Sequence, residues 1–128
     1  MPVRSAFEYA IVRVVPDIVR EEHVNVGAIV FSASSDLLRA AIELDEARLL
    51  ALAPDVDLAL VREHLAAIPI VCAGGPSAGV MGTLPLRERF AWLVSPRNNV
   101  IQLSAPHAGV CDDPNTALER LMKTMVRR

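Results

Sequence analysis

The sequence predicts an α+β fold, in which a mostly antiparallel sheet of about four strands carries packed helices within a single domain. Three observations predict it. Runs rich in β-branched and aromatic residues come early, at residues 7–15, 24–31 and 37–44. Apolar residues then recur at helical spacing in the middle of the chain. A short apolar run at 100–104 and a final helical pattern follow, and strands largely segregated from helices are typical of an α+β domain.

Length and composition fit one domain over residues 1–128, because 52% hydrophobic residues suffice for a single core. A net charge of −2 with mixed signs makes nucleic-acid binding an unfavoured function. Cys72 and Cys111 are too few and too far apart for a metal-binding cysteine pair or a disulfide scaffold. Neither a signal-like leader nor an apolar run near the length of about 18 residues that spans a bilayer is present. We therefore expect a soluble, cytoplasmic protein that does not enter a membrane.

The first three runs are expected to pair in order. Residues 7–15 are apolar on both faces, which indicates a central strand or one covered on two sides. The polar residues 32–36 separate the second and third runs and favour a turn. We therefore expect an antiparallel hairpin.

Aspartates and prolines mark the helices that follow. Asp45 is a good N-cap for a short helix that ends before Pro54. Asp55 or Asp57 caps a second helix, whose apolar residues recur at helical spacing. We expect Pro69 to end that helix, because proline has no backbone N–H.

Small residues at 73–79 predict a flexible loop. A helix over 83–94 follows, with Pro85 early, where a helix tolerates proline. After the strand at 100–104, residues 105–109 are expected to break the regular structure.

The chain ends in an amphipathic helix. Asp112 or Asp113 caps it, and Pro114 lies in its first turn. Its predicted buried stripe comprises Leu118, Leu121, Met122 and Met125.

Two polar segments interrupt this apolar chain. The first, residues 16–27, joins a Pro-Asp turn, four consecutive ionisable residues and the start of a strand. Asn25 and Gly27 are poor strand formers, and a glycine inside a strand marks a bulge or a close approach. Two interpretations remain open: a strand bulge in which the asparagine satisfies backbone groups, and a ligand contact.

The second polar segment, residues 89–98, brings two guanidinium groups and an indole within a short span. Arg89, Trp92, Arg97 and Asn98 could together bind a phosphate, a carboxylate or a stacked base. For Trp92, the only tryptophan, packing in the core is the favoured alternative, because large aromatic side chains are mostly buried.

Glu21 and Glu22 could form a general acid/base or metal-binding pair. Adjacent residues on an extended segment point to opposite sides, so at most one faces a given pocket. The favoured interpretation is a solvated loop whose carboxylates form ion pairs with arginines such as Arg89 and Arg97.

His107, Cys111, Asp112 and Asp113 form the one cluster of mixed metal-ligand types. A zinc site would need further ligands from distant parts of the chain. A nucleophilic Cys111–His107 pair is disfavoured, because a small buried residue is expected just before a helix cap. The glycines at 74–79 lack the lysine and the strand-to-helix setting of a phosphate loop. We therefore predict no metal site and no cofactor.

A resemblance to a known family rests on motifs whose order and spacing span nearly the whole chain. They are Pro16-Asp17 after the opening strand, Glu21-Glu22, Val24-Asn25-Val26-Gly27, Arg89-Phe90-x-Trp92-Leu93 with Ser95-Pro96-Arg97, and His107-x-Gly109. With these motifs the chain resembles the bacterial domain-of-unknown-function family numbered 3037. The resemblance implies a small accessory or regulatory subunit, since similar proteins are often encoded beside a HipA-like serine/threonine kinase.

We therefore expect a non-enzymatic regulatory or interaction subunit that works with a partner protein such as a HipA-like kinase. Its binding surface would form where the two polar segments meet on one face. The candidate residues of that surface are Asp17, Glu21, Glu22, Asn25, Gly27, Arg89, Trp92, Arg97, Asn98 and His107. The alternative is a small enzyme acting on an anionic substrate, with a carboxylate of residues 21–22 as acid/base and Arg89 or Arg97 as the anion clamp. A shared face predicts that Glu22 and Arg89 are energetically coupled.

Overall fold

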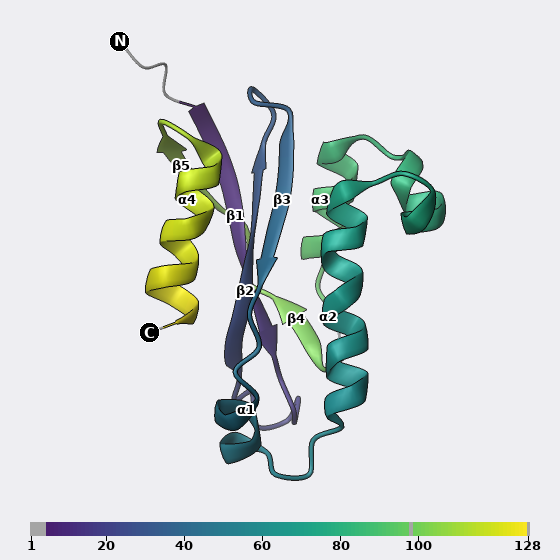
Figure 1. Ribbon diagram of the computed structural model, residues 1–128, viewed down its shortest axis with the longest axis vertical. Helices are drawn as coiled ribbons and strands as arrows, with labels where there is room; N and C mark the ends of the chain where they lie inside the picture. The colour runs from purple at the N-terminus through teal and green to yellow at the C-terminus, as the bar shows by residue number, and fades with distance from the viewer. Residues whose placement is uncertain (1–4, 98, 128) are drawn as a thin grey trace.

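A five-stranded antiparallel sheet forms the centre of the protein and carries helices on both faces (Figure 1). The structure is a computed structural model that describes residues 5–97 and 99–127. Its strands are β1 (Ser5–Val14), β2 (Val24–Ser32), β3 (Leu37–Ile42), β4 (Ile101–Leu103) and β5 (His107–Cys111). The order is β3-β2-β1, and β5 and β4 pair with successive parts of the other edge of β1. The α+β prediction and the hairpin of the second and third strands are confirmed.

The helices divide between the two faces of the sheet. They are α1 (Glu46–Leu52), α2 (Leu58–Ala73), the 3-10 helix η1 (Pro76–Thr83), α3 (Leu86–Val94), α4 (Pro114–Leu121) and the π-helical turn η2 (Met122–Val126). Figure 1 shows α2 and α3 on one side of the strands and α4 on the other. The sheet therefore separates two apolar layers.

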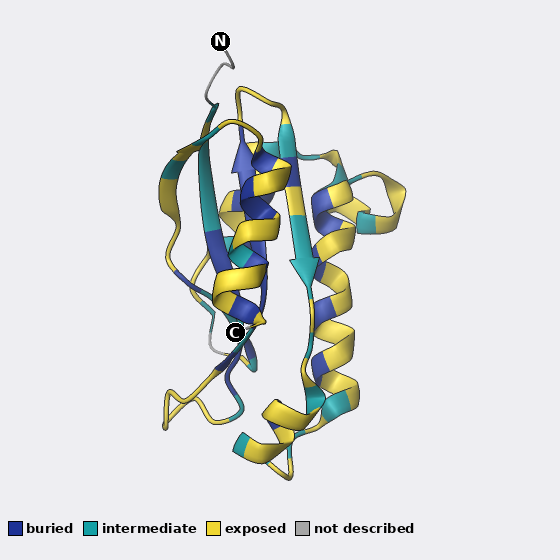
Figure 2. Ribbon diagram, turned by 60° about the vertical axis from the view of Figure 1, so that its left-hand side comes forward, coloured by how far each residue is buried: buried dark blue, intermediate teal, exposed yellow. Residues whose placement is uncertain are grey.

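Both apolar layers use alternate residues of the same strands. On one face, Val12 and Val14 of β1 pack with residues of α2 and α3 such as Leu65 and Phe90. On the other face, Ile11 packs with residues of β2, α4 and η2. Figure 2 shows the buried residues of the long helices on the sides that face the sheet. β1 is thus covered on both faces, as its composition predicts.

Asp45 caps α1 as the sequence predicts, and of the alternatives left open Asp57 caps α2 and Asp113 caps α4. Each carboxylate accepts a hydrogen bond of 2.9 to 3.1 Å from a backbone N–H two or three residues later. Such caps satisfy donors that the first turn of a helix leaves unpaired.

Pro69 does not end α2, which is a correction to the sequence analysis. The helix continues to Ala73 with Pro69 inside it. A helical conformation after the proline is stabilised because it buries Val71 and Cys72 against the sheet. Tertiary burial therefore outweighs the local cost of proline.

The small-residue segment contains the 3-10 helix η1 in place of the predicted irregular loop. Gly75 N–H donates to the carbonyl of Gly82 at 3.3 Å, so the segment folds back on itself. A Cβ atom at residue 82 would lie 2.0 Å from the carbonyl oxygen of Gly75. Only glycine permits that approach. Because η1 extends to Thr83, the next helix begins at Leu86, later than predicted.

The fifth strand was not predicted, because residues 105–109 were expected to break the regular structure. β5 has no run of β-branched residues and forms by pairing with Ser5–Tyr9 at the start of β1. A Cβ atom at Gly109 would lie 2.7 Å from the ring of Phe7. The glycine therefore allows the aromatic ring of one strand to lie over its neighbour.

The predicted stripe of the last helix is wrong at Met125, which is exposed, whereas Val126 is buried. The helix changes from α4 to the π-helical η2 at Met122. A π-turn has more residues than an α-turn, so the buried position moves by one residue.

Within the described ranges, no single helix is long and apolar enough to cross a membrane. The pair α2 and η1, bent by 61°, meets the length and composition together.

Candidate functional site

Residues 16–22 form an ordered turn where β1 ends. The side chain of Asp17 accepts a hydrogen bond of 3.0 Å from the N–H of Val19, and its carbonyl accepts from Arg20 and Glu21. Glu21 completes the turn with a φ of 59°, a conformation that non-glycine residues seldom adopt. The predicted candidate Asp17 therefore shapes this turn with its own polar atoms.

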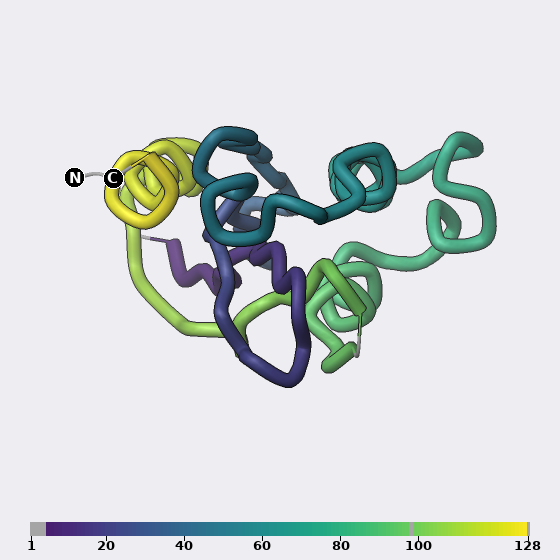
Figure 3. Tube along the Cα trace, turned by 90° about the horizontal axis from the view of Figure 1, so that it is seen from below, coloured from purple at the N-terminus to yellow at the C-terminus, as the bar shows by residue number. Residues whose placement is uncertain are grey.

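The turn presents two aliphatic side chains to solvent. Val19 is 91% exposed, and Ile18 is also exposed. Figure 3 shows the turn projecting from the sheet, in a view from below. Between the turn and the end of α1 lies a hollow of about 620 Å³. Leu52, Ala53 and Pro54 line its far side.

Glu21 and Glu22 are exposed on this turn. The carboxylate of Glu22 accepts a hydrogen bond of 2.5 Å from Nε of Arg20, and this bond raises the pKa of the arginine. No ion pair among the described residues joins either glutamate to Arg89 or Arg97. The Glu22 carboxylate therefore pairs within the turn, and neither glutamate pairs with the arginines expected from the sequence.

Asn25 and Gly27 have structural roles in β2. The register of β1 and β2 shifts so that Val26 is an extra residue, which makes a β-bulge. Nδ2 of Asn25 donates to the carbonyl of Met125 at 3.1 Å, and so holds the end of η2. A Cβ atom at Gly27 would lie 2.5 Å from the carbonyl oxygen of Ala41. Of the two interpretations left open, the bulge with a backbone-satisfying asparagine matches this geometry.

Arg89 is buried and contacts the ends of neighbouring elements. Its Nη1 donates to the carbonyls of Val71 and Cys72 at 2.9 and 2.8 Å, and its Nε donates to Leu84 at 3.0 Å. The guanidinium thereby satisfies carbonyls at the C-terminal end of α2. It does not lie on a surface open to a ligand.

Trp92 is 44% exposed, so the favoured placement in the core is wrong. The guanidinium of Arg97 lies 4.1 Å from the centre of the indole ring and donates to the Trp92 carbonyl. Burial lowers the pKa of Arg97. Arg97 stacks on Trp92 in a cation–π contact, which gives this part of α3 a flat, amphipathic surface. Asn98 lies outside the described residues.

The start of the first polar segment lies beside the loop that follows the second, but the two segments do not form one surface. Val15 N–H donates to the carbonyl of Val100 at 2.7 Å, which places the start of the turn next to the loop that follows α3. Arg89, by contrast, reaches the end of α2 and has no contact with Glu22. The expected coupling of that pair therefore lacks a structural basis.

His107 lies apart from both segments, on β5, where its ring stacks on Tyr9 at 5.2 Å. Cys111 donates its S–H to the carbonyl of Ser5 at 3.7 Å. Burial, Asp113 and Asp112 all raise the pKa of this thiol, which disfavours the thiolate a nucleophile needs. Among the described residues, no three His, Cys, Asp or Glu side chains come close enough to hold a metal ion.

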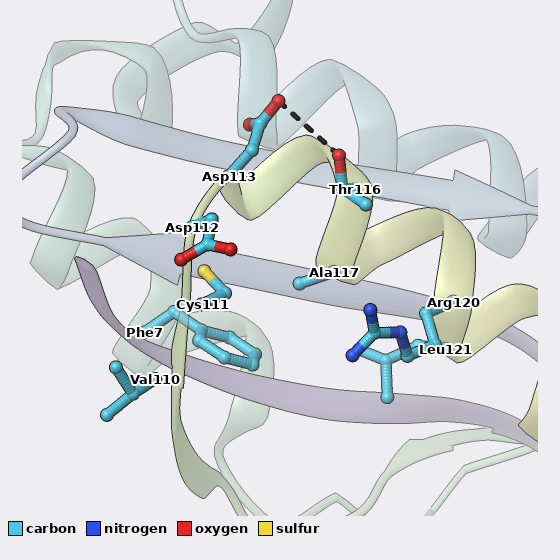
Figure 4. Close-up of a pocket in the computed structure, with 9 residues that line it drawn as sticks. All are labelled: Phe7, Val110, Cys111, Asp112, Asp113, Thr116, Ala117, Arg120 and Leu121. Atoms are coloured by element: carbon cyan, nitrogen blue, oxygen red, sulfur yellow. Dashed lines mark hydrogen bonds between the residues drawn. The ribbon is translucent and has the colours of Figure 1, made fainter. Parts of the chain in front are cut away.

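A second hollow, of about 430 Å³, lies beside β5 and was not predicted (Figure 4). Figure 4 shows Phe7, Val110 and Cys111 on the strand side, with Arg120 and Leu121 on α4 opposite. The start of β1 lies about a hundred positions before the other two elements that line it, the consecutive β5 and α4, and β5 is the strand that the sequence analysis missed. The sequence analysis grouped Cys111, Asp112 and Asp113 only as candidate metal ligands, and the pairing of β5 with β1 that forms the hollow has no signal in local sequence spacing.

Comparison with known proteins gives one family. The family described as "Protein of unknown function (DUF3037)" matches residues 9–126. No curated protein and no solved structure matches the chain.

Proposed function

The chain belongs to the DUF3037 family, whose description names no activity, and we propose that it is a non-enzymatic interaction subunit that binds a partner protein. The exposed aliphatic turn at residues 16–22 carries the proposal. Val19 and Ile18 are exposed on this turn, although the transfer of aliphatic side chains out of water lowers the free energy of the system. An ordered turn that holds them in solvent favours a surface that another molecule covers.

The surroundings of the turn resemble a protein interface in composition. The aliphatic pair lies beside a hollow with an apolar side made by the end of α1. Asp17, Arg20 and Asp55 line the same hollow. An apolar centre with a charged rim is the arrangement found in many protein–protein interfaces.

The partner that we propose is a HipA-like kinase, on the basis of the family resemblance. The loop after α3 adjoins the turn through the Val15–Val100 hydrogen bond. Trp92 and Arg97 would extend the contact on that side, since aromatic and arginine side chains are enriched at interfaces.

The alternative, an enzyme with a glutamate acid/base and an arginine clamp, receives less support from the geometry. Arg89 uses its donors on backbone carbonyls, and Glu22 is paired with Arg20. Neither arrangement leaves these groups directed at a common substrate.

The test uses the Val19→Asp variant with Val80→Asp as its matched control. Val80 is a valine of similar exposure, 81%, on η1. We expect Val19→Asp to weaken binding to the co-expressed HipA-like kinase by at least about tenfold, since a buried valine contributes about 1.5 kcal/mol or more. Val80→Asp should leave binding unchanged. Affinity is measured by biolayer interferometry, with thermal melts to confirm that both variants fold.

Two outcomes would contradict the proposal. One is equal affinity of the wild type and Val19→Asp for the kinase. The other is recovery of the wild-type chain as a free monomer when the two proteins are co-expressed and purified gently.

A further inference from the structure

β5 is an edge strand of the sheet. It pairs with β1, and no other strand of the described chain pairs with it. Figure 1 shows it at the outer side of the sheet, beneath the start of α4. An edge strand presents backbone N–H and C=O groups that lack a neighbouring strand.

The direction of these groups follows from β1. The N–H and the C=O of Ile11 both bond to Ser104, so the peptide groups of Ile11 face the β4 and β5 side. Peptide groups alternate along a strand, and those of Phe7 and Tyr9 therefore face β5. Their partners in the register are Gly109 and His107.

Ala108 and Val110 consequently direct their peptide groups to the free edge. Their side chains are exposed as well, and Val110 is 60% exposed. The sequence of β5, HAGVC, has no proline and no lysine, arginine or carboxylate. Natural edge strands usually carry such residues, which prevent pairing with another chain, and β5 carries none of them.

A hollow lies beside β5 on each face of the sheet. On the α4 face, Phe7, Cys111 and Leu121 line the hollow of about 430 Å³ (Figure 4). On the opposite face, Ala108, Phe31 and Arg87 line another of about 350 Å³. Alternate side chains of an added strand point to opposite faces, so each hollow lies next to one set of them.

We propose that the outer edge of β5 is a strand-addition site for an extended segment of a partner protein. The peptide groups of Ala108 and Val110 bond to its backbone, and a large apolar side chain of the segment enters the hollow between Phe7 and Leu121. This is the recognition mode in which main-chain hydrogen bonds give affinity and side-chain pockets give specificity. The site is separate from the 16–22 turn and does not depend on the function proposed for that turn.

A second copy of this chain fits the edge less well than a partner segment. Of the five residues of β5, only His107 has a large side chain, and it already stacks on Tyr9. Another β5 would therefore leave both hollows unfilled. An extended segment with larger apolar side chains fills them and buries more apolar surface.

The test starts from a phage-displayed library of random peptides selected on the full chain. One enriched peptide, synthesised with a fluorescent label, is the probe. We expect it to slow amide hydrogen exchange at Ala108 and Val110, because those N–H groups become hydrogen-bonded. This footprint needs no variant, so it tests the site even if a substitution impairs folding.

The matched variants are Val110→Pro and Val110→Thr. Proline removes the outward N–H, and an edge strand tolerates it where the N–H faces solvent; threonine keeps the N–H and the β-branched shape. We expect Val110→Pro to weaken peptide binding by about tenfold or more, as the loss of a buried hydrogen bond implies, and Val110→Thr to bind like the wild type. Fluorescence anisotropy measures both.

Three results would overturn the proposal. The first is that no peptide is enriched above background, and the second is that the enriched peptide binds both variants equally or protects amides elsewhere. The third is a wild-type dimer in sedimentation that Val110→Pro dissociates, since the occupant would then be a second copy.

Discussion

Arg89 places a guanidinium in the protein interior, where it donates hydrogen bonds to backbone carbonyls. A buried charge is costly unless hydrogen bonds replace its hydration. The carbonyls of Val71 and Cys72 supply them, and they lie at the negative end of the α2 dipole. Gly74 makes room, since a Cβ atom there would lie 2.8 Å from Nη1 of Arg89. Arg89 thus links α3 to the end of α2.

This environment predicts the cost of removing Arg89. We expect Arg89→Ala to lower the free energy of unfolding by on the order of 3 kcal/mol, because several buried carbonyls lose their donor. Glu22→Ala should cost less than about 1 kcal/mol, since its pair with Arg20 is exposed. The costs should add in the double variant, as they do for separate sites. Urea denaturation measures the free energy of unfolding of the three variants. A double variant clearly more stable than the sum of the two single costs predicts would support the coupling of Glu22 and Arg89 expected from the sequence.

At the level of elements, α2 contains a proline in its interior, where proline destabilises a helix. Pro69 lies inside the helix and is exposed. Because proline has no backbone N–H, it cannot donate a hydrogen bond to the carbonyl four residues earlier. The helix persists because Leu65, Ile68 and Val71 are buried against the sheet. Packing of one helical face therefore maintains a helix that local propensity disfavours.

We expect Pro69→Ala to raise the free energy of unfolding by about 2 kcal/mol. The gain is the proline penalty of about 3 kcal/mol less the unfolded-state entropy that proline removes. Pro85→Ala is the matched control, because Pro85 is also exposed but precedes α3 and interrupts no helical hydrogen bond. Guanidinium denaturation measures both variants. A Pro69→Ala chain no more stable than the wild type would show that the proline is accommodated without cost.

For the whole molecule, the two apolar layers share one sheet. Val12 and Ile11 are neighbours on β1, yet they belong to opposite layers. Loss of β1 or β2 would expose both layers at once. The molecule is therefore expected to unfold as one unit, in keeping with a single domain.

Coincident unfolding transitions test this expectation. Trp92 fluorescence reports on α3, whereas far-UV circular dichroism reports on all helices and strands. We expect the two signals to give the same urea midpoint within error. A fluorescence transition that precedes the loss of secondary structure would mean that α2 and α3 detach from the sheet separately.

Features that depend on near neighbours in the chain could be predicted from the sequence. Asp45 was identified as a cap, and the caps of α2 and α4 were narrowed to two aspartates each, because a cap bonds to a backbone group only two or three residues away. The hairpin after β2 follows from a polar turn between two apolar runs. The bulge at Asn25 and Gly27 was one of two interpretations, since residue type alone indicates that a strand is irregular and not which contact makes it so.

Contacts between residues far apart in the chain became known only from the folded structure. β5 exists because residues 107–111 meet the start of β1 about a hundred positions earlier, and the hollow of about 430 Å³ between β5 and α4 exists only with it. Arg89 is buried because the ends of α2 and η1 bring three carbonyls around it, and Trp92 is exposed because α3 presents its Phe90 side to the sheet. These outcomes depend on which faces of the elements meet, and that choice is set by the total apolar surface buried across the fold, which no local window of sequence contains.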